Sequence, residues 1–266
     1  MELRIENSFE LLSQEEWDKY LGVDLFEDMK IKYNILGASE DIFKSINAPR
    51  LSDLIQEYNN KVGELCISYA LCRHYYDKGI PDEPWYKSPG NNGASITYFP
   101  NFSEEHWMRH FWFDFFSDTF YLKMFATWDS IIEIIDEYYQ YGIKKDLRFR
   151  TNVMKELEKD NPKLVEAFKS IQKNEMYVNA NIFRTAAAHG TSASEVSNTV
   201  QVQRDITVDI PKFVNGISTT ESVKANRIIS YSAGSYTSTD TIIKNMEDFT
   251  RFSGHQIQEI INLMET

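Results

Sequence analysis

Apolar residues recur at helical spacing along two long stretches in the first half of this 266-residue chain. The first stretch follows Ser52, which we expect to cap a helix that stops at Gly79. The second follows Ser103, where two glutamates open a helix that continues to Gly142 and is long enough for a kink to be expected. Such apolar stripes are buried against neighbouring helices, so the pattern predicts a helical bundle.

The second half of the chain continues this pattern and interrupts it once. Residues 150–190 are predicted to be helical in pieces, with a restart at Asn161-Pro162 and a break near Asn174. At about 197–236 the period changes to alternation, which predicts a small β-hairpin. Asp240 is then expected to cap the last helix. We therefore expect a mainly α fold, a four-helix bundle with a β insertion before its last helix.

The remaining segments are shorter. Residues 1–48 are predicted to be an N-terminal elaboration of one bundle domain that occupies residues 49–266. Within this elaboration we expect a short helix at 14–21 and a strand-like stretch at 29–36. Residues 80–100 contain four prolines and are expected to be a connecting loop.

Composition and charge narrow the classes of function. The chain is 42% hydrophobic, which is ample for a core, and its net charge of -12 disfavours broad attraction to nucleic acid or to anionic membranes. Any contact with nucleic acid must then be local. The N-terminus has no secretory signal, and the spacing of Cys66 and Cys72 on a helix does not let them bridge, so we expect reduced thiols in a cytoplasmic protein without a membrane segment.

Most motifs of nucleotide-dependent and metal-dependent enzymes are absent, including the phosphate loop and the paired Cys-x2-Cys zinc site. One row of residues on a helix face nevertheless suggests a metal-binding site. His106, His110 and Asp114 lie four residues apart on one helix, and two histidines at this spacing can chelate a metal ion. A solvated helix face would have the same pattern, and no complementary Glu-x2-His is present. A metal-binding bundle enzyme therefore stays an alternative.

Arg184 and His189 lie together just before Gly190, at the predicted end of a helix. A guanidinium binds phosphate oxygens, and an imidazole transfers protons near neutral pH. On an unbroken helix the two side chains lie about 140° apart and do not converge on one phosphate. A site then requires that the helix ends here or that a second copy completes it. The small side chains at 186–188 permit close helix approach.

This pair resembles the signature of the HEPN superfamily, the higher eukaryotes and prokaryotes nucleotide-binding domains. In that signature an arginine is followed, after four to six residues, by a histidine on the penultimate long helix of a bundle. A second stretch, LKMFATWDSII at residues 122–132, resembles the Trp-Asp stretch of stand-alone bacterial HEPN proteins through Trp128 and Asp129.

The resemblance implies a HEPN-like four-helix bundle that forms a homodimer and cleaves RNA without metal or cofactor, or binds RNA or nucleotide without cleaving it. Arg184 would hold phosphate, and His189 would transfer protons. Members often serve in toxin-antitoxin and phage-defence systems, which implies an antitoxin protein as a partner. Many members have Asn, Asp or His directly after the arginine, where this chain has Thr185. A non-catalytic interaction module therefore stays open beside the endoribonuclease.

Further residues are expected near this pair. Asp129 and Asn181 are predicted to support it, although Asp129 is also the expected ion-pair partner of Arg184 if the arginine is only structural. The densest basic patch is expected to contact an RNA backbone, unless it is simply a solvated face, and comprises Lys144, Lys145, Arg148 and Arg150.

Overall fold

A computed structural model describes residues 9–21, 24–32, 42–82, 86–88, 95–97, 102–190, 192–194, 198–214, 217–233 and 236–265. The chain divides into two units. The first comprises Met1–Tyr86, Thr97–Ser194 and Thr237–Thr266 and holds the helices; the second comprises Lys87–Ile96 and Glu195–Tyr236. The prediction of a mainly α fold with a hairpin before the last helix is confirmed.

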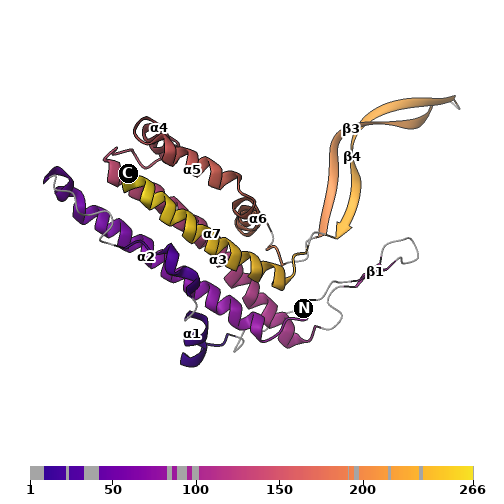
Figure 1. Cartoon of the computed structure of the whole chain (residues 1–266). Helices are drawn as coiled ribbons and strands as arrows, with labels where there is room; N and C mark the ends of the chain where they lie inside the picture. Colours follow the sequence, from indigo (N-terminus) through magenta and orange to yellow (C-terminus); the bar gives the residue numbers. More distant parts are fainter. Residues whose placement is uncertain are drawn as a thin grey trace. The chain divides into compact units, whose positions relative to one another are not determined.

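The helical unit is built on three long helices that run side by side (Figure 1). These are α2 (Ile42–Asp77), α3 (Glu104–Tyr139) and α7 (Thr239–Glu265). Three shorter helices follow α3 in the chain: α4 (Phe149–Asp160), α5 (Pro162–Lys173) and α6 (Glu175–His189). The helix α6 packs on both α3 and α7, so the end of α6 is held by the main helices.

Three predicted helix starts are confirmed by their caps. Ser103 Oγ accepts the backbone N–H of His106 at 3.4 Å, and the Ser103 N–H donates to His106 Nδ1 at 3.0 Å, which makes a reciprocal capping box. The side-chain oxygens of Asn161 and Asn174 accept backbone N–H groups in the first turns of α5 and α6, at 3.1 and 2.9 Å. The break near Asn174 is therefore a cap between two helices.

Two other predicted starts were wrong. The helix α2 already begins before Pro49 and contains it, so Ser52 lies inside the helix. A proline removes only one main-chain hydrogen bond, which the packing of the later turns outweighs. In α7 Ser238 Oγ accepts the backbone N–H of Thr241 at 3.3 Å, and the buried Asp82 carboxylate accepts that of Thr239 at 2.7 Å, so these two side chains cap the helix and Asp240 does not.

In the N-terminal segment the predicted helix is present and the predicted strand is not found in the described residues. The helix α1 (Gln14–Leu21) has the expected bounds, but a 3-10 helix, η1 (Asp24–Met29), follows it, and residues 30–32 form no strand. The rest of the predicted strand lies outside the described residues. Met29 and Ile31 are buried, and the Asn59 side chain bonds both the N–H and the C=O of Ile31, at 3.0 and 2.9 Å. The alternating pattern thus reflects an extended segment paired with one side chain.

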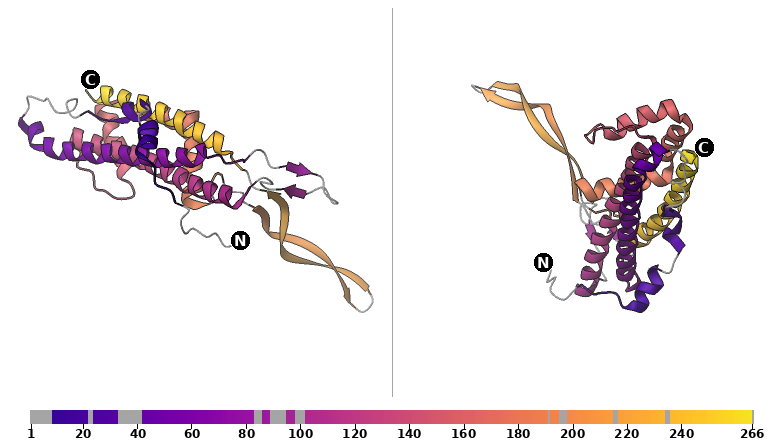
Figure 2. Two further views of the ribbon diagram at one scale, coloured as in Figure 1. Left: turned by 90° about the horizontal axis from the view of Figure 1, so that it is seen from below. Right: turned by 90° about the vertical axis from the view of Figure 1, so that its left-hand side faces the viewer.

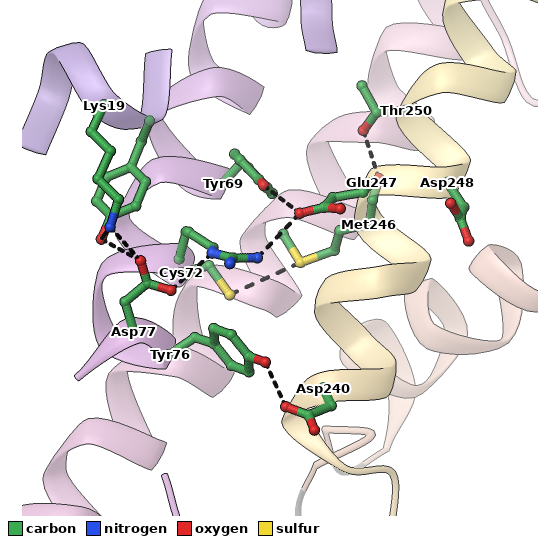
Figure 3. A network of polar contacts seen from close by, with 12 residues as sticks. Lys19, Tyr69, Cys72, Tyr76, Asp77, Asp240, Met246, Glu247, Asp248 and Thr250 are labelled. Atoms are coloured by element: carbon green, nitrogen blue, oxygen red, sulfur yellow. Dashed lines mark hydrogen bonds and ion pairs between the residues drawn. The ribbon is translucent and has the colours of Figure 1, made fainter. Parts of the chain in front are cut away.

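A polar network joins α1, α2 and α7 (Figure 3). The Asp77 carboxylate accepts hydrogen bonds from Lys19 Nζ at 2.7 Å, from the Tyr20 hydroxyl at 3.0 Å and from Arg73 Nε at 2.9 Å. Arg73 also reaches Glu247 on α7 at 3.2 Å. Burial would raise the pKa of Asp77, but the bonds from Lys19 and Tyr20 and the charge of Arg73 hold it below its usual range.

Replacing Asp77 with asparagine should lower the free energy of unfolding at pH 7 by about 1–2 kcal/mol, because three donors lose their charged acceptor. A depressed pKa stabilises the fold above the unfolded pKa and ceases to do so as the pH falls through the folded value. The difference between variant and wild type should therefore shrink below about pH 4. Urea unfolding at pH 7 and pH 3 measures both effects. Glu64→Gln, in an exposed pair with Lys123, is the control; a difference that does not change with pH would contradict the prediction.

The second unit is made of β-strands in the part that the structure describes. The strands β3 (Asn198–Val214) and β4 (Ile217–Ala233) pair antiparallel from Asn198↔Ala233 to Val214↔Ile217, with two register shifts, and form a twisted ribbon (Figure 2). The predicted hairpin is confirmed, and it is longer than its apolar alternation indicated. The short strands β1 (Tyr86–Ser88) and β2 (Ser95–Thr97) pair within the segment expected to be only a loop.

Candidate functional site

The helix α6 is anchored through few residues. Ala180 is its one buried side chain among those described. Next to it, the ring of Tyr177 meets three aromatic rings, those of Phe125, Trp128 and Phe249, with centroids at 5.2, 6.2 and 6.1 Å. This aromatic contact fixes the rotation of α6 about its axis and so decides which of its residues face the bundle.

Arg184 and His189 lie on different sides of α6. The helix ends at His189, as predicted, and Gly190 donates its N–H to the Ala186 carbonyl at 2.8 Å. Arg184 is half-buried, whereas His189 is exposed. Because both residues are still within the helix, the separation of about 140° remains. One chain by itself does not bring the two side chains onto the same phosphate.

Asp129 pairs with Arg150 and not with Arg184. Arg150 Nη1 lies 3.3 Å from Asp129 Oδ1, and the two side chains are 38% and 68% exposed. Among the described residues no carboxylate forms an ion pair with Arg184. The alternative in which Asp129 neutralises a purely structural Arg184 does not hold, because the first turn of α4 brings a different arginine to that carboxylate.

The charges of Arg150 and Arg184 both act on the hydroxyl of Tyr177. Tyr177 and Arg184 are two turns apart on the same face of α6. Arg150 has the larger influence of the two on this hydroxyl, and Asp129 acts on it as well. Burial raises the pKa of this hydroxyl, which keeps it protonated near neutral pH, while the two arginines act in the opposite direction. Sequence reasoning missed Tyr177, although its i, i+7 spacing to Arg184 was a readable signal.

The other predicted contact residues are exposed but dispersed. Asn181 lies on the outer side of α6. Lys144, Lys145 and Arg148 lie in the segment between α3 and α4, and Lys145 is paired with Glu133. These positions could meet a long RNA strand, but they do not gather with Arg184 in the way that Arg150 does.

The predicted metal stripe serves other contacts. His106 belongs to the capping box of α3, and His110 Nδ1 lies 3.2 Å from Asp114 Oδ2. Asp114 also accepts a hydrogen bond from the Ser194 hydroxyl. Within the described part of the chain, no three His, Cys, Asp or Glu side chains are arranged to hold a metal ion. The described residues therefore give no support to the alternative of a metal site at His106, His110 and Asp114.

Instead, Asp114 and Asp118 on this face of α3 hold the segment that follows α6. Asp118 Oδ1 accepts the hydroxyl of Ser192 at 3.0 Å, one turn from the contact between Asp114 and Ser194. Ala193, between these serines, accepts the backbone N–H of Thr237 at 2.9 Å. The end of α6 and the start of α7 are thus tied to each other and to α3. The serines after Gly190 were the sequence signal for this anchor, and it was not recognised.

The two cysteines are free thiols and are not nucleophiles. Burial raises the pKa of Cys66 to about 11 and that of Cys72 well above the ordinary thiol value. Almost no thiolate forms near neutral pH, so thiol chemistry is not a candidate activity.

The family model of Cthe2314-like HEPN domains matches residues 54–257. The chain belongs to the HEPN superfamily. The match begins in α2, ends in α7 and includes α6 and the hairpin insertion. HEPN domains have RNA-related nuclease or nucleotide-binding functions and often dimerise. Comparisons with curated proteins and with solved structures gave no match.

One further finding concerns membranes. Among the helices that the structure describes, none combines the length and the apolar character needed to cross a membrane.

Proposed function

We propose that this HEPN protein is a metal-independent endoribonuclease that acts as a cytoplasmic homodimer, of the bacterial toxin-antitoxin or defence type. The observation that carries the proposal is the end of α6. There, an exposed His189 and a half-buried Arg184 without a carboxylate partner among the described residues lie on one short helix of the HEPN domain. These are the two side chains that phosphodiester cleavage needs.

The chemistry follows from the substrate. In RNA the 2′-hydroxyl attacks the neighbouring phosphorus, a bond forms between O2′ and phosphorus, and the bond between phosphorus and O5′ breaks. The products are a cyclic 2′,3′-phosphate and a free 5′-hydroxyl. His189 would accept the 2′-hydroxyl proton, and the leaving oxygen would take up a proton from water. Arg184 would stabilise the charge that develops on the phosphate oxygens.

A dimer supplies what the single chain lacks. The outer face of α6 carries exposed apolar side chains beside His189, with Val178 at 43% and Ile182 at 59% exposure. A contact between two copies along this face covers these side chains and joins two α6 helices across a twofold axis. Arg184 of one copy can then act with His189 of the other, which the 140° separation prevents within one copy.

A mixing experiment tests this arrangement. Arg184→Ala and His189→Ala homodimers should each have almost no activity on a single-stranded RNA. Co-expression of the two variants should restore a measurable fraction of wild-type cleavage, because the mixed dimer contains one site with both wild-type residues. Purified mixed dimers and homodimers, matched for mass by sedimentation, are compared by gel assay. Activity no higher than in the homodimers would refute a shared site, and tight RNA binding without turnover in the wild type would favour the non-catalytic module that Thr185 leaves open.

A further inference from the structure

Two arginines from different helices act on the hydroxyl of Tyr177 in a chain whose net charge is -12: Arg150, which is paired with Asp129 at 3.3 Å, and Arg184, on the same face of α6 as Tyr177. Arg150 lies in the first turn of α4, and Arg184 lies near the end of α6. Asp129 is the carboxylate paired with this group among the described residues. One negative charge thus faces two guanidinium groups, so the net charge of this group of side chains is +1.

The ion pair that occupies this cluster is easily exchanged. The Asp129 side chain is 68% exposed, and its distance of 3.3 Å to Arg150 is long for a charge-assisted hydrogen bond. Exposed pairs of this kind contribute little, because water screens them and both side chains lose freedom when they pair. A phosphate group offers a guanidinium two acceptor oxygens, which makes it a stronger partner than this single contact.

The side chain of Tyr177 is held in place. Three aromatic rings surround the ring of Tyr177, so its position is set by the core and not by a ligand. Burial keeps the hydroxyl protonated, so that it can donate a hydrogen bond. The helix α4 also begins here without a side-chain cap, and the positive end of its dipole lies next to Arg150. All of these groups favour an anion.

We propose that Arg150, Tyr177 and Arg184 form a phosphate-binding site in which a phosphodiester of RNA displaces Asp129 from Arg150. Arg184 then connects this site to the proposed cleavage site, and Arg150 and Tyr177 position the strand through a phosphate next to the one that is cleaved. The identification of RNA as the ligand rests on the proposed function, whereas the binding of a phosphate group does not depend on cleavage.

Binding of a short, fluorescently labelled 2′-O-methyl RNA to the full-length protein tests the proposal. This probe lacks the attacking hydroxyl and cannot be cleaved. Arg150→Gln should weaken binding roughly tenfold or more, and Tyr177→Phe, which keeps the ring, about 2- to 10-fold. Asp129→Asn should tighten binding by about 2- to 5-fold, since the competing carboxylate loses its charge. Arg150→Gln should also reduce the slope of log Kd against log salt by about 0.7.

Arg251 and Asp248 provide matched controls, since they form a comparable exposed pair on α7 at 3.8 Å. Arg251→Gln and Asp248→Asn should bind the probe within about twofold of wild type. If Arg150→Gln binds like these controls and Asp129→Asn does not bind more tightly, the phosphate site is refuted, even where unmodified RNA is cleaved. If Arg150→Gln binds the probe more weakly and Asp129→Asn more tightly, but unmodified RNA stays intact, the phosphate site stands and the endoribonuclease is refuted. If the variants change the binding of ATP in this way and the RNA probe does not bind, the assignment of RNA as the ligand is refuted.

Discussion

Replacement of His189 with alanine is expected to lower RNA cleavage by roughly 10²- to 10⁴-fold, the usual loss when a general acid or base is removed. RNA binding should be retained, because His189 is exposed at the end of α6 and contributes no packing to the bundle core. Cleavage is measured with end-labelled single-stranded RNA, and binding with the 2′-O-methyl probe. Expression of the wild type should arrest bacterial growth, and expression of the variant should not.

A matched histidine separates catalysis from a general effect of losing an imidazole. His255 is also exposed on a helix, α7, and lies outside the candidate site. His255→Ala should cleave RNA at the wild-type rate and fold equally well. Wild-type cleavage by His189→Ala would remove the endoribonuclease mechanism, and a parallel loss of binding and cleavage would reassign His189 to substrate binding.

Replacement of Trp128 with alanine should destabilise the fold by about 3–5 kcal/mol, the usual range for a buried tryptophan. Trp128 is 3% exposed, its Nε1 donates to Ser253 Oγ at 3.3 Å, and its ring contacts Tyr177 at 6.2 Å between centroids. The truncation leaves a cavity between α3, α6 and α7. Since domains are stable by only about 5–15 kcal/mol, this loss is a large fraction of the total. Urea unfolding followed by far-UV circular dichroism measures the change.

Trp128→Phe is the control for this prediction, because it keeps an aromatic ring and removes mainly the indole N–H and part of the volume. It should lose clearly less stability than the alanine variant. A loss below about 1 kcal/mol in Trp128→Ala would mean that the site collapses without a cavity. RNA binding by the phenylalanine variant should stay close to that of wild type, since Tyr177 keeps two of its three aromatic neighbours and a ring at the third.

Local signals predicted the helix starts whose caps are close in sequence. Ser103, Asn161 and Asn174 each bond an N–H within three residues, so the chain itself contains the whole motif. The start of α7 combines a local cap, Ser238, with a bond from Thr239 to Asp82, 157 residues away. No periodicity shows Asp82 as a partner, and the prediction of Asp240 missed Ser238. In fact Asp240 accepts the hydroxyl of Tyr76 at 2.6 Å.

The same distinction applies to the candidate site. The Arg184 and His189 pair and the helix end at Gly190 could be read from ten consecutive residues. The cluster of Arg150 and Tyr177 with Arg184 could not, because it depends on how α4 and α6 pack against α3. The alternative that pairs a structural Arg184 with Asp129 fails for this reason: charge alone suggests a pair, and packing decides which of two arginines reaches the acid.

The backbone hydrogen bond of 2.9 Å from Thr237 to Ala193 closes the insertion at its base. For the helical unit, the chain between Ala193 and Thr237 is equivalent to a loop whose two ends are joined by this hydrogen bond. The entropy of such a loop depends only weakly on its length, about 0.6 kcal/mol for each doubling. The insertion can therefore be lengthened, shortened or replaced at little cost to the helical unit, including α6. For the same reason, this loop is the natural place to graft a label or a foreign recognition module into the protein.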